Sequence, residues 1–138
     1  MKKKIAILGS TGSIGKSLLK IISRNKSKYE IILLSANKDY KTLIKQAKKF
    51  SVKNIIITNK DSFIILQKKL KNKNINIFNN FNELNKILKK KVDYTMSAII
   101  GIDGLLPTIK LIKFSKAIAI ANKESIICGW DIIQKNLK

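Results

Sequence analysis

Short apolar runs alternate along the whole chain with stretches in which apolar residues recur at helical spacing. The apolar runs predict strands over residues 4–8, 29–35, 54–58, 75–78, 92–98 and 117–121. The helical spacing predicts helices over residues 14–22, 43–50, 61–70, 81–88, 105–114 and 125–135, with Ser13 capping the first and Asp61 or Ser62 the third. Strands and helices in alternation form βαβ units. We therefore predict an α/β fold, with one doubly wound, mostly parallel sheet and helices on both of its faces.

A glycine-rich segment joins the first predicted strand to the first predicted helix: Gly9-Ser10-Thr11-Gly12-Ser13-Ile14-Gly15. Glycines at such a junction permit a tight turn and let the backbone approach a pyrophosphate, while the free N–H groups of the helix start hold the anion. The spacing of the three glycines is a variant common among NADP-binding folds. A glycine-rich turn without a ligand is the alternative. We interpret the segment as the phosphate loop of a Rossmann-like domain, with hydroxyl donors from Thr11 and Ser13.

Loops after the other strands should complete the site, because a doubly wound sheet binds ligands beyond the C-terminal ends of its strands. After the second strand, where an NAD enzyme usually places an acid, the chain has Asn37 and Lys38. A lysine there pairs with a 2′-phosphate, so the sequence favours NADP over NAD. Asp39 is either a charge near that phosphate or the N-cap of the next helix. Residues 121–125, Ala-Asn-Lys-Glu-Ser, either serve a ligand or cap the helix that follows.

Composition excludes several other classes of function. The chain has no histidine and one cysteine, Cys128, which rules out a Ser-His-Asp triad and an internal disulfide and leaves little room for a zinc site. Its apolar runs are far shorter than the ~20 residues of a membrane span. We therefore expect a soluble cytoplasmic domain with no membrane partner.

The formal net charge of +21 would suit a nucleic-acid-binding protein. However, Arg24 is the sole arginine among 29 basic residues, and aromatic residues make up 7% of the chain. Base-edge readout favours arginine, and single-strand binding relies on aromatic stacking. The abundance of Lys, Ile and Asn is typical of AT-rich coding. We therefore expect no specific nucleic-acid partner, with non-specific polyanion binding as a side effect.

Three segments together resemble the 1-deoxy-D-xylulose 5-phosphate reductoisomerase family: residues 7–15, Gly104-Leu105-Leu106-Pro107-Thr108 and Ala121-Asn122-Lys123-Glu124-Ser125. Their order and separation also fit, and the resemblance covers the entire chain. It implies contacts to NADPH for the following residues: Thr11, Gly12, Ser13, Ile14, Asn37, Lys38, Asn122 and Glu124. It also implies that Lys123 contacts the sugar-phosphate substrate.

The resemblance further implies the activity of the complete enzyme. Such an enzyme rearranges and reduces 1-deoxy-D-xylulose 5-phosphate to 2-C-methyl-D-erythritol 4-phosphate with NADPH, in isoprenoid precursor biosynthesis. A divalent cation, Mg²⁺ or Mn²⁺, is held by carboxylates of a second domain. This sequence has no paired acids of that kind and no candidate catalytic residue. We therefore expect residues 1–138 to be the NADPH-binding domain without its catalytic domain, inactive alone and homodimeric when full length. Another NADP-dependent dehydrogenase domain and a basic nucleic-acid-binding module are the alternatives.

Overall fold

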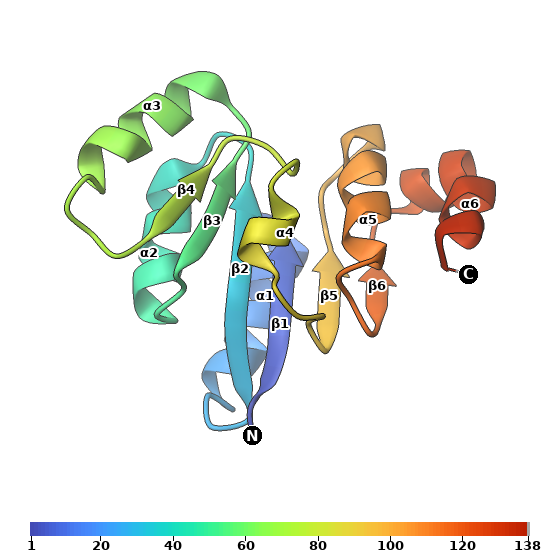
Figure 1. Ribbon diagram of the computed structural model, residues 1–138, viewed down its shortest axis with the longest axis horizontal. Coiled ribbons are helices and arrows are strands. Elements are labelled where there is room, and N and C mark those ends of the chain that lie inside the picture. Colours follow the sequence, from blue (N-terminus) through green and yellow to red (C-terminus); the bar gives the residue numbers. More distant parts are fainter. Residues whose placement is uncertain (138) are drawn as a thin grey trace.

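The computed structural model describes residues 1–137 and contains a sheet of six strands, each parallel to its neighbours. The strand order is β4-β3-β2-β1-β5-β6, which runs from left to right in Figure 1. The chain moves outward from β1 to β4 and then returns to the other side of β1 for β5. This reversal confirms the predicted doubly wound α/β fold and places its switch point between β1 and β5.

Apart from the helix predicted over residues 81–88, the elements begin and end close to the residues that the sequence predicts. The strands are β1 (Lys3–Leu8), β2 (Tyr29–Ala36), β3 (Asn54–Ile57), β4 (Asn76–Phe78), β5 (Tyr94–Ser97) and β6 (Ile118–Ile120). The helical elements are α1 (Ser13–Ser23), α2 (Tyr40–Lys49), α3 (Lys60–Lys69), α4 (Leu84–Ile87), the 3₁₀ turn η1 (Ile102–Gly104), α5 (Leu105–Ile112) and α6 (Lys123–Leu137). Each strand is followed by a helical element, so the loops after the strands gather at one edge of the sheet.

Apolar layers cover both faces of the sheet, because successive strand residues point to opposite faces. One layer is formed with α1, α2 and α3, whose buried residues include Leu19, Ile22, Leu43, Ala47 and Leu66. The other layer is formed with α4 and α5, whose buried residues include Leu84, Ile87 and Leu111. Figure 1 shows α4 in front of the sheet, α1 behind it, and α6 beside α5. The two layers hold the strand ends, and thus the loops, in a fixed arrangement.

The structure corrects the predicted starts of two helices. Gly12 precedes α1, and Ser13 is already its first helical residue, so Ser13 does not cap it. Asn59 caps α3, because its side chain accepts a hydrogen bond from Ser62 N at 3.0 Å. A cap residue lies outside the helix and faces the N–H groups of the first turn. Asp61 and Ser62 lie inside that turn and cannot fill this role.

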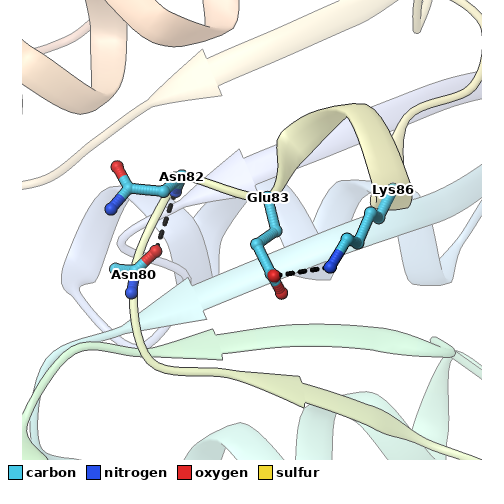
Figure 2. A network of polar contacts seen from close by, with 4 residues as sticks. All are labelled: Asn80, Asn82, Glu83 and Lys86. Carbon is cyan, nitrogen blue, oxygen red and sulfur yellow. Dashed lines mark hydrogen bonds and ion pairs between the residues drawn. The ribbon is translucent and has the colours of Figure 1, made fainter.

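The helix predicted over residues 81–88 is reduced to the single turn α4. Ahead of it, Asn82 N donates a hydrogen bond to Asn80 Oδ1 at 2.9 Å, which forms an Asx turn (Figure 2). Glu83 then forms an ion pair of 2.7 Å with Lys86 (Figure 2). The Asx turn replaces helical hydrogen bonding at its residues, which delays the helix start. Phe81, in the middle of this turn, is buried and lines the cleft described below.

Candidate nucleotide-binding site

Two glycines of the segment 9–15 are required by the packing of the loop. Gly9 has a φ of +74°, and a Cβ added to it would lie 2.6 Å from the backbone oxygen of Ala98, just after β5. A Cβ added to Gly15 would lie 2.5 Å from the backbone oxygen of Gly9. Glycine therefore lets the loop lie directly against the end of β5 and lets α1 start directly behind the loop.

Gly12 differs from these two glycines, because the fold leaves space beside it. The atom nearest to an added Cβ would be the backbone oxygen of Gly9 at 3.5 Å, an ordinary contact. Gly12 opens α1, whose start has no side-chain cap and no acidic residue. Within residues 1–137 the backbone N–H groups of Thr11, Ser13 and Ile14 donate no hydrogen bond. The loop therefore presents free donors at a position where no side chain blocks the approach of an anion.

The loop forms one wall of a cleft of about 790 Å³ at the C-terminal ends of the strands. The cleft crosses the switch point and is lined by residues that follow or end β1 to β5: Gly9, Thr11, Gly12, Ser35, Ala36, Asn37, Thr58, Phe81, Ala98, Ile99, Ile100, Ile102, Asp103, Leu106 and Pro107. Its wall after β1 and β2 is rich in polar groups, whereas its wall after β5 is largely apolar. A phosphate group and a flat ring can therefore be accommodated in one site.

The cleft brings together the predicted cofactor-binding residues Thr11, Gly12 and Asn37. The other predicted residues lie outside its lining: Ser13, Ile14, Lys38, Asn122, Lys123 and Glu124. The first three of these are exposed, and each lies within two residues of a lining residue. The last three lie at the start of α6, where Asn122 precedes the helix and Lys123 and Glu124 are its first residues, and Asn122 links this start to the cleft.

The segment after β2 is held by the connection between β3 and α3. Asn59 N donates to Asn37 O at 3.0 Å, and Thr58 Oγ1 donates to Asn37 Oδ1 at 3.2 Å. Ser62 Oγ donates to Lys38 O at 2.9 Å, while the Lys38 side chain is exposed. The backbone of both predicted residues is therefore fixed, and the ammonium group of Lys38 lies in solvent.

Asp39 is the N-cap of α2, as one of the two alternatives for this residue predicts. Its Oδ1 accepts a hydrogen bond from Thr42 N at 3.0 Å. Hydrogen bonding by Thr42, through its side chain and then its backbone, lowers the pKa of Asp39 below its ordinary value, and the positive charges of Lys16 and Lys45 add to this effect. The carboxylate is thus engaged by its own helix, and nearby lysines offset its charge.

Asn122 ties the start of α6 to the loop after β5. Its Nδ2 donates to the backbone oxygens of Ile99 and Gly101, each at 2.5 Å, and its Oδ1 accepts from Ser125 N at 2.7 Å. Gly104 leaves room for this amide, since an added Cβ would lie 2.5 Å from Asn122 Nδ2. Capping is therefore confirmed for Asn122, which also holds one wall of the cleft in place.

Helix α6 begins at Lys123, two residues before the predicted start. Ser125 is buried inside the first turn, so it does not cap the helix. Lys123 is exposed and Glu124 is half-buried. Successive helical side chains diverge by about 100°, so these two residues face different directions. Their contacts with a ligand stay predictions.

Two buried polar residues that no motif predicts also contact the glycine loop. Ser35 Oγ accepts a hydrogen bond from Gly9 N at 3.1 Å. Gln46, on α2, exchanges hydrogen bonds with Ser10. In the sequence, Ser35 could be found as a hydroxyl residue at the end of an apolar strand. Gln46 could be found as an amide residue next to Ala47, on the helix face that packs against the sheet.

Cation ligands and membrane-spanning helices are both absent from residues 1–137. That part of the chain has no group of three or more His, Cys, Asp or Glu side chains placed to hold a metal ion. None of its helices is long and apolar enough to cross a membrane. Cys128 is exposed and free.

The position of the glycine-rich loop decides the class of protein. A doubly wound parallel sheet whose first loop opens onto its switch point is a Rossmann-type dinucleotide-binding domain. The family model of 1-deoxy-D-xylulose 5-phosphate reductoisomerase matches residues 5–129, and the chain belongs to this family. Membership decides against the alternative of another NADP-dependent dehydrogenase domain.

Curated relatives agree with this membership. The 1-deoxy-D-xylulose 5-phosphate reductoisomerase of Pelagibacter ubique is 61% identical over 138 residues, which cover 99% of this chain and 36% of the relative. The 1-deoxy-D-xylulose 5-phosphate reductoisomerase of Buchnera aphidicola is 44% identical over 131 residues, which cover 92% of this chain and 33% of the relative. The chain thus spans about a third of the length of these relatives.

Solved structures resemble the domain closely. A 1-deoxy-D-xylulose 5-phosphate reductoisomerase from Zymomonas mobilis in complex with NADPH has a TM-score of 0.89 and 32% identity, covering 99% of this chain and 36% of that chain. A reductoisomerase in complex with NADPH, fosmidomycin and magnesium has a TM-score of 0.87 and 31% identity, and the match covers 98% of this chain and 34% of that chain. The similarity therefore extends over nearly the whole domain.

Proposed function

We propose that residues 1–138 form the NADPH-binding domain of a 1-deoxy-D-xylulose 5-phosphate reductoisomerase. The observation that carries this proposal is the open space beside Gly12, at an uncapped helix start inside the switch-point cleft. An anion is favoured there, because the N–H groups and the helix dipole attract negative charge. The NADPH-bound relatives support the identity of the ligand.

Residues 11–14 are proposed to hold the pyrophosphate. Thr11, Ser13 and Ile14 offer free backbone N–H groups, Thr11 and Ser13 add hydroxyls, and Gly12 leaves the space that the pyrophosphate needs. Asn37 and Lys38 are proposed to bind the adenosine ribose and its 2′-phosphate. Lys38 supports this role because Ser62 holds its backbone while its ammonium group is exposed. A phosphate would give that ammonium group a charged hydrogen-bond partner.

The start of α6 and the residue before it are proposed to serve both ligands. Asn122 acts on NADPH by holding the backbone of the loop after β5, since its amide is already engaged there. Glu124 is proposed to contact the cofactor, and Lys123 to meet the anionic or hydroxyl-rich sugar phosphate. The different directions of adjacent helical side chains, about 100° apart, support this division of roles.

In the complete enzyme, bound NADPH supplies the hydride that reduces rearranged 1-deoxy-D-xylulose 5-phosphate to 2-C-methyl-D-erythritol 4-phosphate. The share of this domain is to bind and orient the cofactor. Within residues 1–137 no group of three or more His, Cys, Asp or Glu side chains is placed to hold a metal ion. We propose that Mg²⁺ or Mn²⁺ is held elsewhere in the enzyme, as the magnesium-bound relatives suggest. A cytoplasmic homodimer is part of the same proposal.

Fluorescence titration of the chain with NADPH and with NADH tests the cofactor assignment. Wild type should bind NADPH more tightly than NADH. Lys38→Ala should lower the affinity for NADPH by roughly ten- to hundred-fold, which is the effect of losing a charge-assisted hydrogen bond. The affinity for NADH should stay unchanged. Lys41→Ala is the matched control, because Lys41 is also exposed and lies three residues further along. Equal affinity for both cofactors would remove Lys38 from its role. Absence of binding by either cofactor would contradict the proposed function.

A further inference from the structure

We propose that Gln46 is a positioning residue for the cofactor, because its amide clamps Ser10 and thereby orients the loop that presents free N–H groups to a pyrophosphate. The inference rests on the proposed function for its ligand. The clamp itself is a property of the fold and can be measured without any ligand.

Gln46 holds Ser10 at two points. Ser10 Oγ donates to Gln46 Oε1 at 2.7 Å, and Gln46 Nε2 donates to Ser10 O at 2.9 Å. A carbonyl oxygen only accepts, so the NH₂ end of the amide must face Ser10 O, which fixes the orientation of the side chain. Ser10 is fully buried and Gln46 is 8% exposed. Neither group can exchange its partner for bulk water without opening the structure.

The end of β2 holds the backbone on the other side of Ser10. Ser10 N donates to Ser35 O at 2.9 Å, and Gly9 N donates to Ser35 Oγ at 3.1 Å. The N–H, the carbonyl and the hydroxyl of Ser10 are thus all engaged. The N–H of Ser10 belongs to the peptide unit before this residue and its carbonyl to the unit after it. Each unit is planar, so holding both units restricts the direction of the backbone that follows. The residues that follow are Thr11 and Gly12, which line the cleft.

The clamp also connects two parts of the site. Gln46 lies seven residues after Asp39, the N-cap of α2, and Lys38 directly precedes that cap. Helix α2 therefore follows the proposed 2′-phosphate segment directly and, two turns later, contacts the proposed pyrophosphate loop through Gln46. Gln46 sets the distance between the two phosphate-binding segments, which NADPH must span.

Gln46→Met removes both hydrogen bonds and keeps the length of the side chain. It should weaken NADPH binding by about ten-fold, since a buried polar partner loses its hydrogen bond. Affinity is measured well below the unfolding midpoint, so that only folded protein is compared. Gln67→Met is the matched control, because Gln67 is exposed on α3. Adding Ser10→Ala to Gln46→Met should cause little further loss, because both changes break one clamp.

Amide hydrogen exchange of the ligand-free chain measures the clamp directly. Gln46→Met should speed exchange at Ser10 and Gly12 and leave the core amides of β3 unchanged. Wild-type affinity together with wild-type exchange at these amides would overturn the proposal, as would exchange raised uniformly through the sheet. If Gln46→Met does not fold, Ser10→Ala alone, which deletes one hydroxyl, takes its place in both measurements. Failure of wild type to bind NADPH would contradict the proposed function, and the exchange result would still decide the clamp.

Discussion

Gly12 is the residue at which ligand binding should separate from folding. An added Cβ makes only an ordinary contact at 3.5 Å, and the backbone has a φ of −77°, which any residue adopts. Gly12→Val should therefore leave the unfolding midpoint nearly unchanged. It should abolish NADPH binding, because the branched side chain fills the space that the pyrophosphate needs. Thermal unfolding and calorimetric titration on the same sample check both halves of this prediction.

Gly9→Val is the control for Gly12→Val. At Gly9 the positive φ and the short distance to the Ala98 carbonyl make any side chain costly, by about 1–3 kcal/mol in the free energy of unfolding. The two variants should thus differ in stability. NADPH binding by Gly12→Val with wild-type affinity would mean that the pyrophosphate does not approach this position.

Among the elements, α2 gives a pH-dependent test, because its N-cap titrates. The pKa of Asp39 is lower in the folded chain than its ordinary value of 3.8. The ionised cap therefore stabilises the fold above that ordinary value, and this stabilisation is lost as the pH falls through the lowered pKa. Asp39→Ala should lower the free energy of unfolding by about 1 kcal/mol at neutral pH. Urea unfolding measures this difference.

Asp39→Asn separates the charge of the cap from its hydrogen bond. Asparagine caps a helix without titrating, so the stability difference between wild type and Asp39→Asn should shrink as the pH is lowered from about 5 toward 3. Parallel pH profiles of the two proteins would show that ionisation of Asp39 does not stabilise the fold.

At the scale of elements, the sequence predicts the strands and the phosphate loop, because buried parallel strands and glycine turns leave strong local patterns. It predicts a helix at α4 but overestimates its length, since the Asx turn at Asn80 overrides the apolar spacing that indicates a longer helix. It does not predict the contact of Gln46 with Ser10, which are 36 residues apart. That contact depends on how α2 packs beside the loop, and no local pattern encodes it.

The same limit applies to residues 122–125. Their spacing indicates both a cap and a ligand site, and only the fold shows that Asn122 reaches the loop after β5. Gly104 lies beside the same amide, since an added Cβ would lie 2.5 Å from Asn122 Nδ2, and the family resemblance names Gly104 and Asn122 in separate segments. Tertiary packing thus explains why Gly104 and Asn122 occur together.

For the whole molecule, the high positive charge offers a rival site for any anionic ligand. Two ion pairs, Lys86–Glu83 and Lys116–Asp93, occur within residues 1–137, so most lysines there have no acidic partner within 4 Å. A shallow groove between α2 and α3 is lined by four lysines: Lys41, Lys45, Lys48 and Lys69. A polyanion could gather there through charge alone, with strong dependence on salt.

Mapping of backbone amide shifts in the isotopically labelled chain during an NADPH titration decides between the two locations. We expect saturable changes concentrated in residues 9–15, 36–38 and 98–107, and we expect them to persist at about 150 mM salt, where free charges are screened beyond roughly 8 Å. Changes centred on the lysine groove between α2 and α3, or changes that vanish at that salt concentration, would contradict the assignment of the switch-point cleft as the NADPH site.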